Sequence, residues 1–151
     1  MVMDEEVAPD REALIRNDPY CAFLGIELVS IGSGSAATRL SITEDHLNFH
    51  GVPHGGAINS LADAAFAAAS NADGDDAFAL ETNVSFLEAV EVGTTLTATA
   101  RRTHETRQTG EYEVVVTADT DDGGAADEQE TAGDPATDDR IATFRGRVYR
   151  P

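Results

Sequence analysis

The sequence contains no lysine, so its 10 basic residues are all arginines, and they face 28 acidic residues for a formal net charge of -18. A charge so far from zero keeps a chain soluble but destabilises its compact state through self-repulsion. Molar salt shortens the Debye length to about 3 Å and removes most of that repulsion. We therefore expect a salt-loving microbe with a high-salt cytosol as the source. We expect no nucleic-acid partner, because binding a phosphate backbone requires a broad basic face.

Cysteine, tryptophan and long apolar runs are also scarce. Cys21 is the only cysteine, which excludes a disulfide within the chain and fits a reducing compartment. No apolar stretch approaches the roughly 20 residues that a membrane-spanning helix needs. Residues 1–10 are acidic and lack the basic and apolar regions of a signal peptide. These observations predict a cytoplasmic protein with no membrane partner.

The 151 residues are 41% hydrophobic, which suffices for one domain with its own core. Disorder, which also favours high charge, is expected only for 120–139, a stretch of Asp, Glu, Gly and Ala with almost no large apolar residue. We interpret the chain as a single domain over 1–151, in which this acidic loop is an insertion that aids solubility.

Hydrophobic periodicity divides the rest of the chain into helices and strands. A short helix is predicted at 9–21, broken near Pro19, and a long alanine-rich helix is predicted at 57–74. Period-two alternation between turn residues predicts strands at 25–31, 35–43, 77–88, 94–105, 111–119 and 140–149. This order indicates an α+β fold in which an antiparallel sheet packs against one principal helix.

The residues best suited to chemistry precede the long helix. His54, Gly55 and Gly56 lie where a loop becomes a helix, and the first N–H groups of a helix have no partner within it. The helix dipole favours negative charge there, and glycine lets a substrate oxygen approach the backbone closely. Such a turn can stabilise an oxyanion, although a plain helix start explains the same residues without any chemistry.

Asp63 lies within the small, apolar residues of the long helix. In a dry cleft its pKa would rise, which suits a general base or a nucleophile; a surface charge is the alternative interpretation. Straight helix separates Asp63 from Gly55 by about 12 Å, so one carbonyl group cannot contact both. Two antiparallel helices from two chains remove this difficulty. The chemistry therefore predicts a two-fold dimer with two equivalent sites at its interface.

Three histidines, His46, His50 and His54, have the i, i+4, i+8 spacing of a helical metal site. Gly51 and Pro53 interrupt any helix there, so we expect no bound metal. No other cofactor is expected either.

These features form a pattern that resembles a known family. Asn48 is followed by His54-Gly55-Gly56 and then by Leu61-Ala62-Asp63-Ala64-Ala65, and this spacing is similar to that of hotdog-fold acyl-CoA thioesterases of the phenylacetic-acid-degradation (PaaI) type. Later stretches also resemble strands of that family, namely 83–102, 107–116 and 142–150. The likeness runs from about residue 20 to the end, apart from the acidic insertion.

The resemblance implies a hotdog fold, in which an antiparallel sheet wraps around one long central helix, and hydrolysis of acyl-CoA thioesters such as hydroxylated phenylacetyl-CoA. It implies that the Gly55 N–H polarises the thioester carbonyl, while Asp63 from the partner chain activates water or attacks directly. Asn48 would hold the carbonyl or the water, and His54 would shape the turn and contact Asn48 or substrate. Coenzyme A then enters as part of the substrate, and a homodimer, further paired into a homotetramer, is expected.

Substrate contacts are also expected from residues around the turn. Gly56 and Thr82 are assigned to substrate binding, and the apolar acyl pocket is expected to be lined by Leu47, Phe49, Leu61 and Phe66 or by their neighbours in the partner chain. Many relatives carry Ser or Thr on the strand after the helix to orient the water. Ala79 occupies the aligned position here, with Thr82 and Ser85 nearby, so that role is not assigned.

Arginines offer a counter-charge for the phosphates of coenzyme A in this acidic chain. Seven of the 10 lie towards the C-terminus: Arg101, Arg102, Arg107, Arg140, Arg145, Arg147 and Arg150. Some of them could form a phosphate patch, and pairing with the abundant acids is the alternative. Arg107, in the turn before Gln108, is the preferred phosphate contact.

Two other functions are weighed against the thioesterase. An enoyl-CoA hydratase on this fold needs an Asp and His pair set for proton transfer to carbon, whereas here the histidine precedes the helix in His54-Gly55-Gly56. A non-catalytic acyl-CoA binding module needs no carboxylate in the cleft and, if it regulates transcription, a DNA-binding segment. The thioesterase is therefore the preferred function.

Overall fold

The computed structural model describes residues 6–119 and 139–151, so the expected acidic loop lies outside the described residues except for Asp139. The elements follow the chain in the order α1 (Pro9–Arg16), α2 (Pro19–Leu24), β1 (Glu27–Gly32), β2 (Ser35–Ser41), η1 (Glu44–His46), α3 (Gly55–Asn71), β3 (Phe78–Phe86), β4 (Thr95–Glu105), β5 (Thr109–Ala118) and β6 (Arg140–Tyr149). Each predicted strand is present. No helix in the described part of the chain combines the length and apolarity needed to cross a bilayer.

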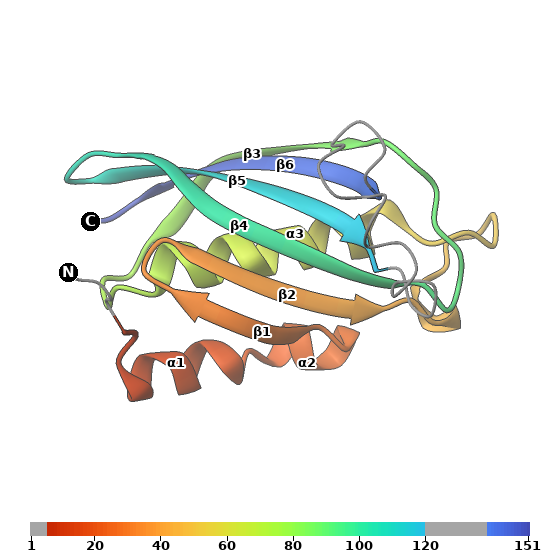
Figure 1. The fold of residues 1–151 in the computed structure, drawn as a ribbon, viewed down its shortest axis with the longest axis horizontal. Coiled ribbons are helices and arrows are strands. Elements are labelled where there is room, and N and C mark those ends of the chain that lie inside the picture. The colour runs from red at the N-terminus through yellow and green to blue at the C-terminus, as the bar shows by residue number, and fades with distance from the viewer. Residues whose placement is uncertain (1–5, 120–138) are drawn as a thin grey trace, which may run out of the picture.

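The strands form one antiparallel sheet in the order β1-β2-β4-β5-β6-β3. The sheet curls around α3, which packs against its inner face, and α1 and α2 lie beside β1 (Figure 1). The two edge strands are therefore different, because β1 has the N-terminal helices next to it, whereas the outer edge of β3 is bare, with no described helix or strand beside it. This is the α+β arrangement expected from the sequence, with one long central helix inside the curve of the sheet.

The core lies between α3 and the inner face of the sheet. Phe66 of α3 is 2% exposed, and its ring packs against Tyr112 of β5 and Phe144 of β6. A Cβ at Gly146 of β6 would come within 2.6 Å of the same ring, so this position requires glycine for the helix to lie directly on the sheet. Alternation explains most of the rest, since the buried positions of β5, and those of β6 from Ala142 onward, are every second residue and the outer positions are more polar.

The N-terminal segment forms two helices, and the second begins at Pro19, where the sequence predicts a break in the helix at 9–21. The carboxylate of Asp18 caps α2 by accepting a hydrogen bond from the Cys21 N–H at 2.9 Å, and Pro19 occupies the first position of that helix. Because a residue before proline avoids the helical conformation, α1 cannot continue into α2.

The two N-terminal helices are tied to α3 near both of its ends. The Arg11 Nε–H donates to Asn71 O at 2.8 Å at the end of α3, and the same guanidinium pairs with Asp76 at 2.9 Å. The Tyr20 hydroxyl lies 3.3 Å from Ser60 Oγ in the first half of α3. A cation at the C-terminal end of a helix also complements its dipole. The helix pair thus forms a wall alongside α3.

Candidate active site

The loop before α3 is closed on itself and holds the start of the helix in place. The His54 N–H donates to His46 O at 2.7 Å, and the Asn48 N–H donates to Val52 O at 2.8 Å. The Asn48 side chain closes the loop from within, because its Oδ1 accepts from the N–H groups of His50 and Val52. Its Nδ2 donates to none of the residues that the structure describes, so this amide keeps a donor for a ligand.

The helix begins at Gly55 and ends at Asn71, whereas the sequence predicts 57–74. The earlier start follows from the His54 side chain, whose Nδ1 accepts a hydrogen bond from the Gly56 N–H at 2.8 Å and caps the first turn. His54 therefore shapes the turn through Gly56 and not through Asn48. The Gly55 N–H donates to no residue in the described chain, which leaves it as the free amide of the turn.

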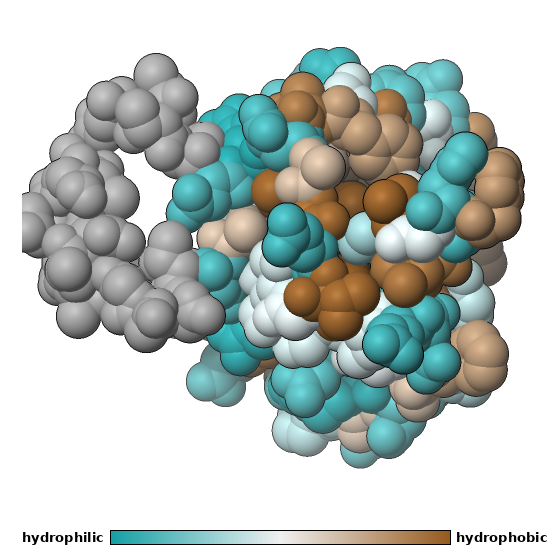
Figure 2. Space-filling model, turned by 90° about the vertical axis from the view of Figure 1, so that its right-hand side faces the viewer, coloured by the Kyte–Doolittle hydropathy of each residue, from teal (hydrophilic) through white to brown (hydrophobic). Residues whose placement is uncertain are grey.

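An open pocket of about 400 Å³ lies over this turn. The Phe86 ring at the end of β3 packs on Gly55, where a Cβ would lie 3.1 Å from the ring. Val52, Ile58 and Leu87 also line the pocket. Hydrophobic side chains gather at this end of the molecule (Figure 2). The Gly55 amide thus lies in apolar surroundings, in which a hydrogen bond to a developing negative charge is strengthened.

Asp63 lies about two turns further along α3. It lines a separate cavity of about 240 Å³ between the N-terminal helices, the first strands and α3. Its side chain reaches solvent in the single chain, yet the surrounding walls desolvate the carboxylate and raise its pKa above the ordinary value. The negative charge of Asp18, which lines the same cavity, raises that pKa further. A carboxylate of raised pKa suits a general base.

Cys21 lines the same cavity as Asp63. Partial burial, followed by the charge of Asp18, raises the pKa of the Cys21 thiol to about 11, so the thiol is protonated at neutral pH. Sequence reasoning missed both Cys21 and Asp18 as neighbours of Asp63. The sequence does contain a signal for the start of α2, since an aspartate before a proline favours a helix start. That signal does not indicate which helix α2 packs against.

One chain does not bring the free Gly55 N–H and Asp63 together. They belong to two different pockets of one uninterrupted helix and lie about 12 Å apart along its axis. One carbonyl group cannot contact both residues of the same chain, and the prediction of a dimer depends on this separation.

Thr82 of β3 faces α3, and Ser85 faces away from it. Thr82 pairs with Gly146, on which the Phe66 ring lies, so Thr82 is on the inner face of the sheet. Ser85 comes three residues after Thr82. Because successive side chains of a strand point to opposite faces of the sheet, Ser85 points to the outer face. Thr82 lies about 13 Å along β3 from Phe86, four residues at 3.3 Å each, and so well away from the glycine turn of its own chain.

The expected acyl pocket needs a correction. Leu61 is 0% exposed and Phe66 is 2% exposed, so both side chains belong to the core between α3 and the sheet and cannot line a pocket at the surface. Because the side chains of this helix are small on all of its faces, the sequence does not indicate which face is buried. Leu47 is half-buried, and Phe49 is 93% exposed in the loop before α3.

Most arginines of the described chain already have acidic partners, and these are Arg11, Arg16, Arg39, Arg101, Arg102, Arg145, Arg147 and Arg150. Arg140 is engaged as well. Arg107, in the turn between β4 and β5, forms no ion pair or hydrogen bond with any residue that the structure describes. It therefore keeps its full charge for a ligand.

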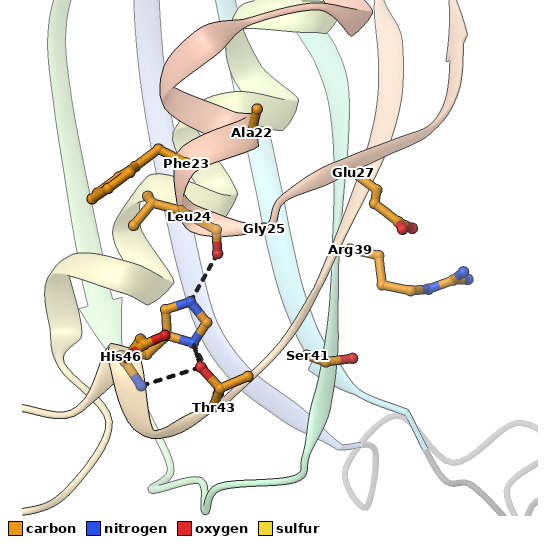
Figure 3. A pocket seen from close by; sticks show the side chains of 10 residues that line it. Ala22, Phe23, Leu24, Gly25, Glu27, Arg39, Ser41, Thr43 and His46 are labelled. Carbon is orange, nitrogen blue, oxygen red and sulfur yellow. Dashed lines mark hydrogen bonds between the residues drawn. The ribbon is translucent and has the colours of Figure 1, made fainter.

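The histidine spacing does not build a metal site. Both ring nitrogens of His46 are used, because Nε2 donates to Leu24 O at 2.8 Å and Nδ1 accepts from the Thr43 N–H at 2.9 Å (Figure 3). His46 lines a groove of about 810 Å³, larger than the two pockets above, whose lining contains none of the predicted catalytic or substrate-binding residues. The Nδ1 of His54 is taken by Gly56, so two of the three histidines serve the backbone.

Comparisons with known proteins show the family to which the chain belongs. The sequence model of the thioesterase superfamily matches residues 50–125. Acyl-coenzyme A thioesterase PaaI of Escherichia coli strain K12 is 34% identical over 148 residues, which are 98% of this chain and 94% of that protein. The chain belongs to the thioesterase superfamily.

Solved structures of thioesterase-superfamily proteins support the same conclusion. The structure of the E. coli PaaI protein from the phenylacetic acid degradation operon has a TM-score of 0.77 at 34% identity and covers 93% of this chain and 89% of that chain. A mutant of phenylacetic acid degradation protein PaaI from Thermus thermophilus, with aspartate in place of an asparagine, has a TM-score of 0.74 at 30% identity and covers 89% and 100%. The predicted hotdog fold and the resemblance to PaaI-type thioesterases are confirmed.

Proposed function

We propose that this thioesterase hydrolyses acyl-CoA thioesters to the free acid and coenzyme A. The observation that carries the proposal is one helix that bears both a free N–H at Gly55 and a carboxylate of raised pKa at Asp63. The likeness to acyl-coenzyme A thioesterase PaaI over 98% of the chain supports the acyl-CoA substrate. It favours neither an enoyl-CoA hydratase nor a non-catalytic binding module.

A second copy of the chain completes the active site. The thioester carbonyl binds between the Gly55 N–H of one chain and Asp63 of the partner subunit, because one straight helix cannot supply both groups. The bare edge strand β3 supports this homodimer. Phe78, Leu80 and Phe86 are each more than half exposed along it, and exposed apolar edges favour pairing with another strand. Pairing of two such dimers into a homotetramer is part of the same proposal.

The residues have distinct roles in the reaction. The Gly55 N–H donates to the carbonyl oxygen and stabilises the oxyanion of the tetrahedral intermediate. Asp63 of the partner subunit, ionised, takes a proton from the water that attacks the carbonyl carbon, or attacks that carbon itself. The C–S bond then breaks, and the coenzyme A thiolate takes up a proton, which protonated Asp63 can supply where it acted as the base. Where Asp63 attacks directly, breaking the C–S bond leaves an anhydride between Asp63 and the acyl group, and a water molecule hydrolyses it to the free acid and the Asp63 carboxylate. Asn48 Nδ2 holds the carbonyl or the attacking water, and His54 and Gly56 keep the turn in shape.

Coenzyme A is part of the substrate, so the proposal includes no cofactor. Arg107 binds one of its phosphates, because none of the described residues forms an ion pair or a hydrogen bond with its guanidinium. Leu47 and Phe49 contact the apolar parts of the substrate near the turn. Hydroxylated phenylacetyl-CoA is one candidate substrate, and a medium-chain or broad range of acyl groups is another.

The charge of -18 supports a high-salt cytosol as the place of action. Salt screens the mutual repulsion of surface carboxylates, so the melting temperature and the activity should both rise between 0.1 and about 2 M KCl. A melting temperature that falls or stays constant over that range would contradict this part of the proposal.

Release of free thiol from a panel of acyl-CoA esters tests the reaction itself. Asp63→Asn should lower kcat about a thousandfold, the scale of a lost general base. Asp75→Asn is the matched control, since it removes an exposed carboxylate from the turn after α3 and should keep full activity. Because the pKa of Asp63 is raised on folding, its ionised form costs stability above that pKa, so Asp63→Asn should melt no lower than wild type at pH 7. Wild type that releases no thiol, or a fully active Asp63→Asn, would refute the proposal.

A further inference from the structure

The turn that carries Arg107 is closed by its own threonines. β4 ends at Glu105 and β5 begins at Thr109, so the tip of the turn is 106–108. The Thr106 N–H donates to Thr109 O at 2.8 Å, and the Thr109 N–H donates to Thr106 Oγ1 at 3.0 Å. These bonds hold the backbone around Arg107, which is itself exposed.

Arg150, which directly follows β6, anchors this turn, and the end of β6 lies beside it (Figure 1). The Arg150 N–H donates to Gln108 O at 2.7 Å, and its guanidinium donates to Thr109 O at 3.3 Å. The same guanidinium pairs with Glu105 Oε2 at 3.2 Å, and the Arg150 side chain is only 12% exposed. A Cβ at Gly110 would lie 3.2 Å from Arg150 Nη2, so glycine leaves room for the guanidinium.

Glu105 is the acidic residue nearest to Arg107 in the sequence. Each of its carboxylate oxygens has an arginine partner, since Arg150 Nη2 pairs with Oε2 and Arg102 Nε pairs with Oε1 at 3.4 Å. Arg102 is held in turn by Asp73, 3.3 Å from its Nη1. Two arginines therefore engage Glu105 while Arg107, two residues further on, has no ion pair within the described chain.

A free carboxylate at this position would compete with a phosphate. In a chain of 28 acidic and 10 basic residues, an unpaired arginine is the exception. Glu105 and Arg107 have long side chains on neighbouring positions of one turn, so a Glu105 released by Arg150 would be attracted to Arg107. A guanidinium that already pairs with a carboxylate must give up that pair before it binds a phosphate, which weakens the binding.

We propose that Arg150 is a positioning residue for the binding of coenzyme A. By holding Glu105, Arg150 keeps Arg107 available for a phosphate of the substrate. This inference rests on the proposed function, in which Arg107 makes that contact. Arg150 acts on the binding of the phosphate through Glu105, and it takes no part in the reaction at the thioester carbonyl.

Two thioesters of one acyl group test this role: an acyl-CoA that wild type hydrolyses, and the acyl-pantetheine, which ends before the phosphates. We expect Arg150→Gln to raise KM for the acyl-CoA about fivefold, the effect of losing one exposed charge-assisted hydrogen bond. KM for the acyl-pantetheine and kcat for both esters should not change, which also shows that the variant is folded. Arg147→Gln is the matched control, because it removes an arginine of β6 that pairs with Glu81 at 3.3 Å, and it should change none of these values.

Rescue by a second substitution shows whether Arg150 acts through Glu105. The double variant Glu105→Gln/Arg150→Gln has no carboxylate to capture Arg107, so KM for the acyl-CoA should return to within about twofold of wild type. In the background of Arg107→Gln, Arg150→Gln should raise KM no further. A KM that stays high in the double variant would overturn the role through Glu105, because a direct contact between Arg150 and the phosphate is not restored by removing Glu105.

A wild-type KM in Arg150→Gln, or an equal rise for the acyl-CoA and the acyl-pantetheine, would also overturn the inference. If Arg107→Gln itself leaves KM for the acyl-CoA unchanged, the phosphate contact of the proposed function fails instead. Failure of wild type to hydrolyse either thioester would refute the proposed reaction, so the three failures are distinguishable.

Discussion

The first turn of α3 and its middle differ in what they offer to a substrate. The first turn presents the uncharged donor of Gly55 beneath the apolar Phe86 ring, and the described lining of its pocket has one charged residue, Glu88. The middle presents Asp63 in a cavity with a second carboxylate, Asp18. In the proposed function, one helix thus carries an oxyanion donor without a base and, about 12 Å away, a base without such a donor. Each chain of the proposed dimer then holds two different halves of a site.

The difference between the two regions of α3 is tested most strongly by removing the N–H of Gly55 while keeping the helix. Gly55→Pro does so, because proline is favoured at the first position of a helix and lacks the N–H. His54, at φ -71° and ψ 134°, already has the conformation that precedes proline. We expect kcat to fall about a hundredfold or more, the scale of a lost oxyanion donor, with little change in the circular dichroism spectrum.

Gly55→Ala is the control for that variant. It adds the same Cβ, about 3.1 Å from the Phe86 ring, but keeps the N–H, so it should lose less than tenfold in kcat. Equal losses in the two variants would show that space under Phe86, and not the amide, is what the reaction requires.

A second prediction concerns the part of the molecule that binds the coenzyme A phosphates. Arg107 lies in the β4–β5 turn, at the left of Figure 1, the same side as the end of α3. Arg107→Gln should raise KM about fivefold and leave kcat unchanged, as expected for the loss of one exposed charge-assisted hydrogen bond. Arg101→Gln, whose guanidinium is paired with Glu113 at 3.0 Å, should change neither value. Similar KM values in all three proteins would exclude Arg107 as the phosphate contact.

The smallest effect is expected from the charge beside the base. In the proposed mechanism Asp63 acts in its ionised form, so activity falls as pH drops through its pKa. Asp18 raises that pKa, and Asp18→Asn should therefore move the acid limb of the kcat/KM profile to lower pH, most clearly at low ionic strength. The Asp75→Asn control should not move it. A limb that stays in place in Asp18→Asn, or moves to higher pH, would mean that Asp18 does not act on Asp63.

The fold could be predicted closely because its strands are half-buried and alternate. The observed strand ends differ from the predicted ones by at most two residues. The glycine turn and Asp63 could also be found, since a helix start and a carboxylate among alanines are local features. Their separation follows from helix geometry alone.

What could not be predicted depends on contacts between distant segments. The cavity around Asp63 exists because α1 and α2 pack against α3, and no periodicity encodes that packing. The face of Thr82 depends on an irregularity between Ala79 and Glu81. Plain alternation from Ala79 would turn Ser85 inward and Thr82 outward, but the extra residue reverses both. The burial of Leu61 in the core could not be predicted, because the surrounding alanines do not indicate which face of the helix is buried.

The central claim is that each active site takes its donor from one chain and its base from another. Mixing Gly55→Pro with Asp63→Asn, by refolding the two inactive variants together, tests it most directly. A mixed dimer contains one site with both substitutions and one with neither, so random pairing should restore about a quarter of wild-type activity. Activity no greater than the sum of the two variants refolded separately would contradict a shared site.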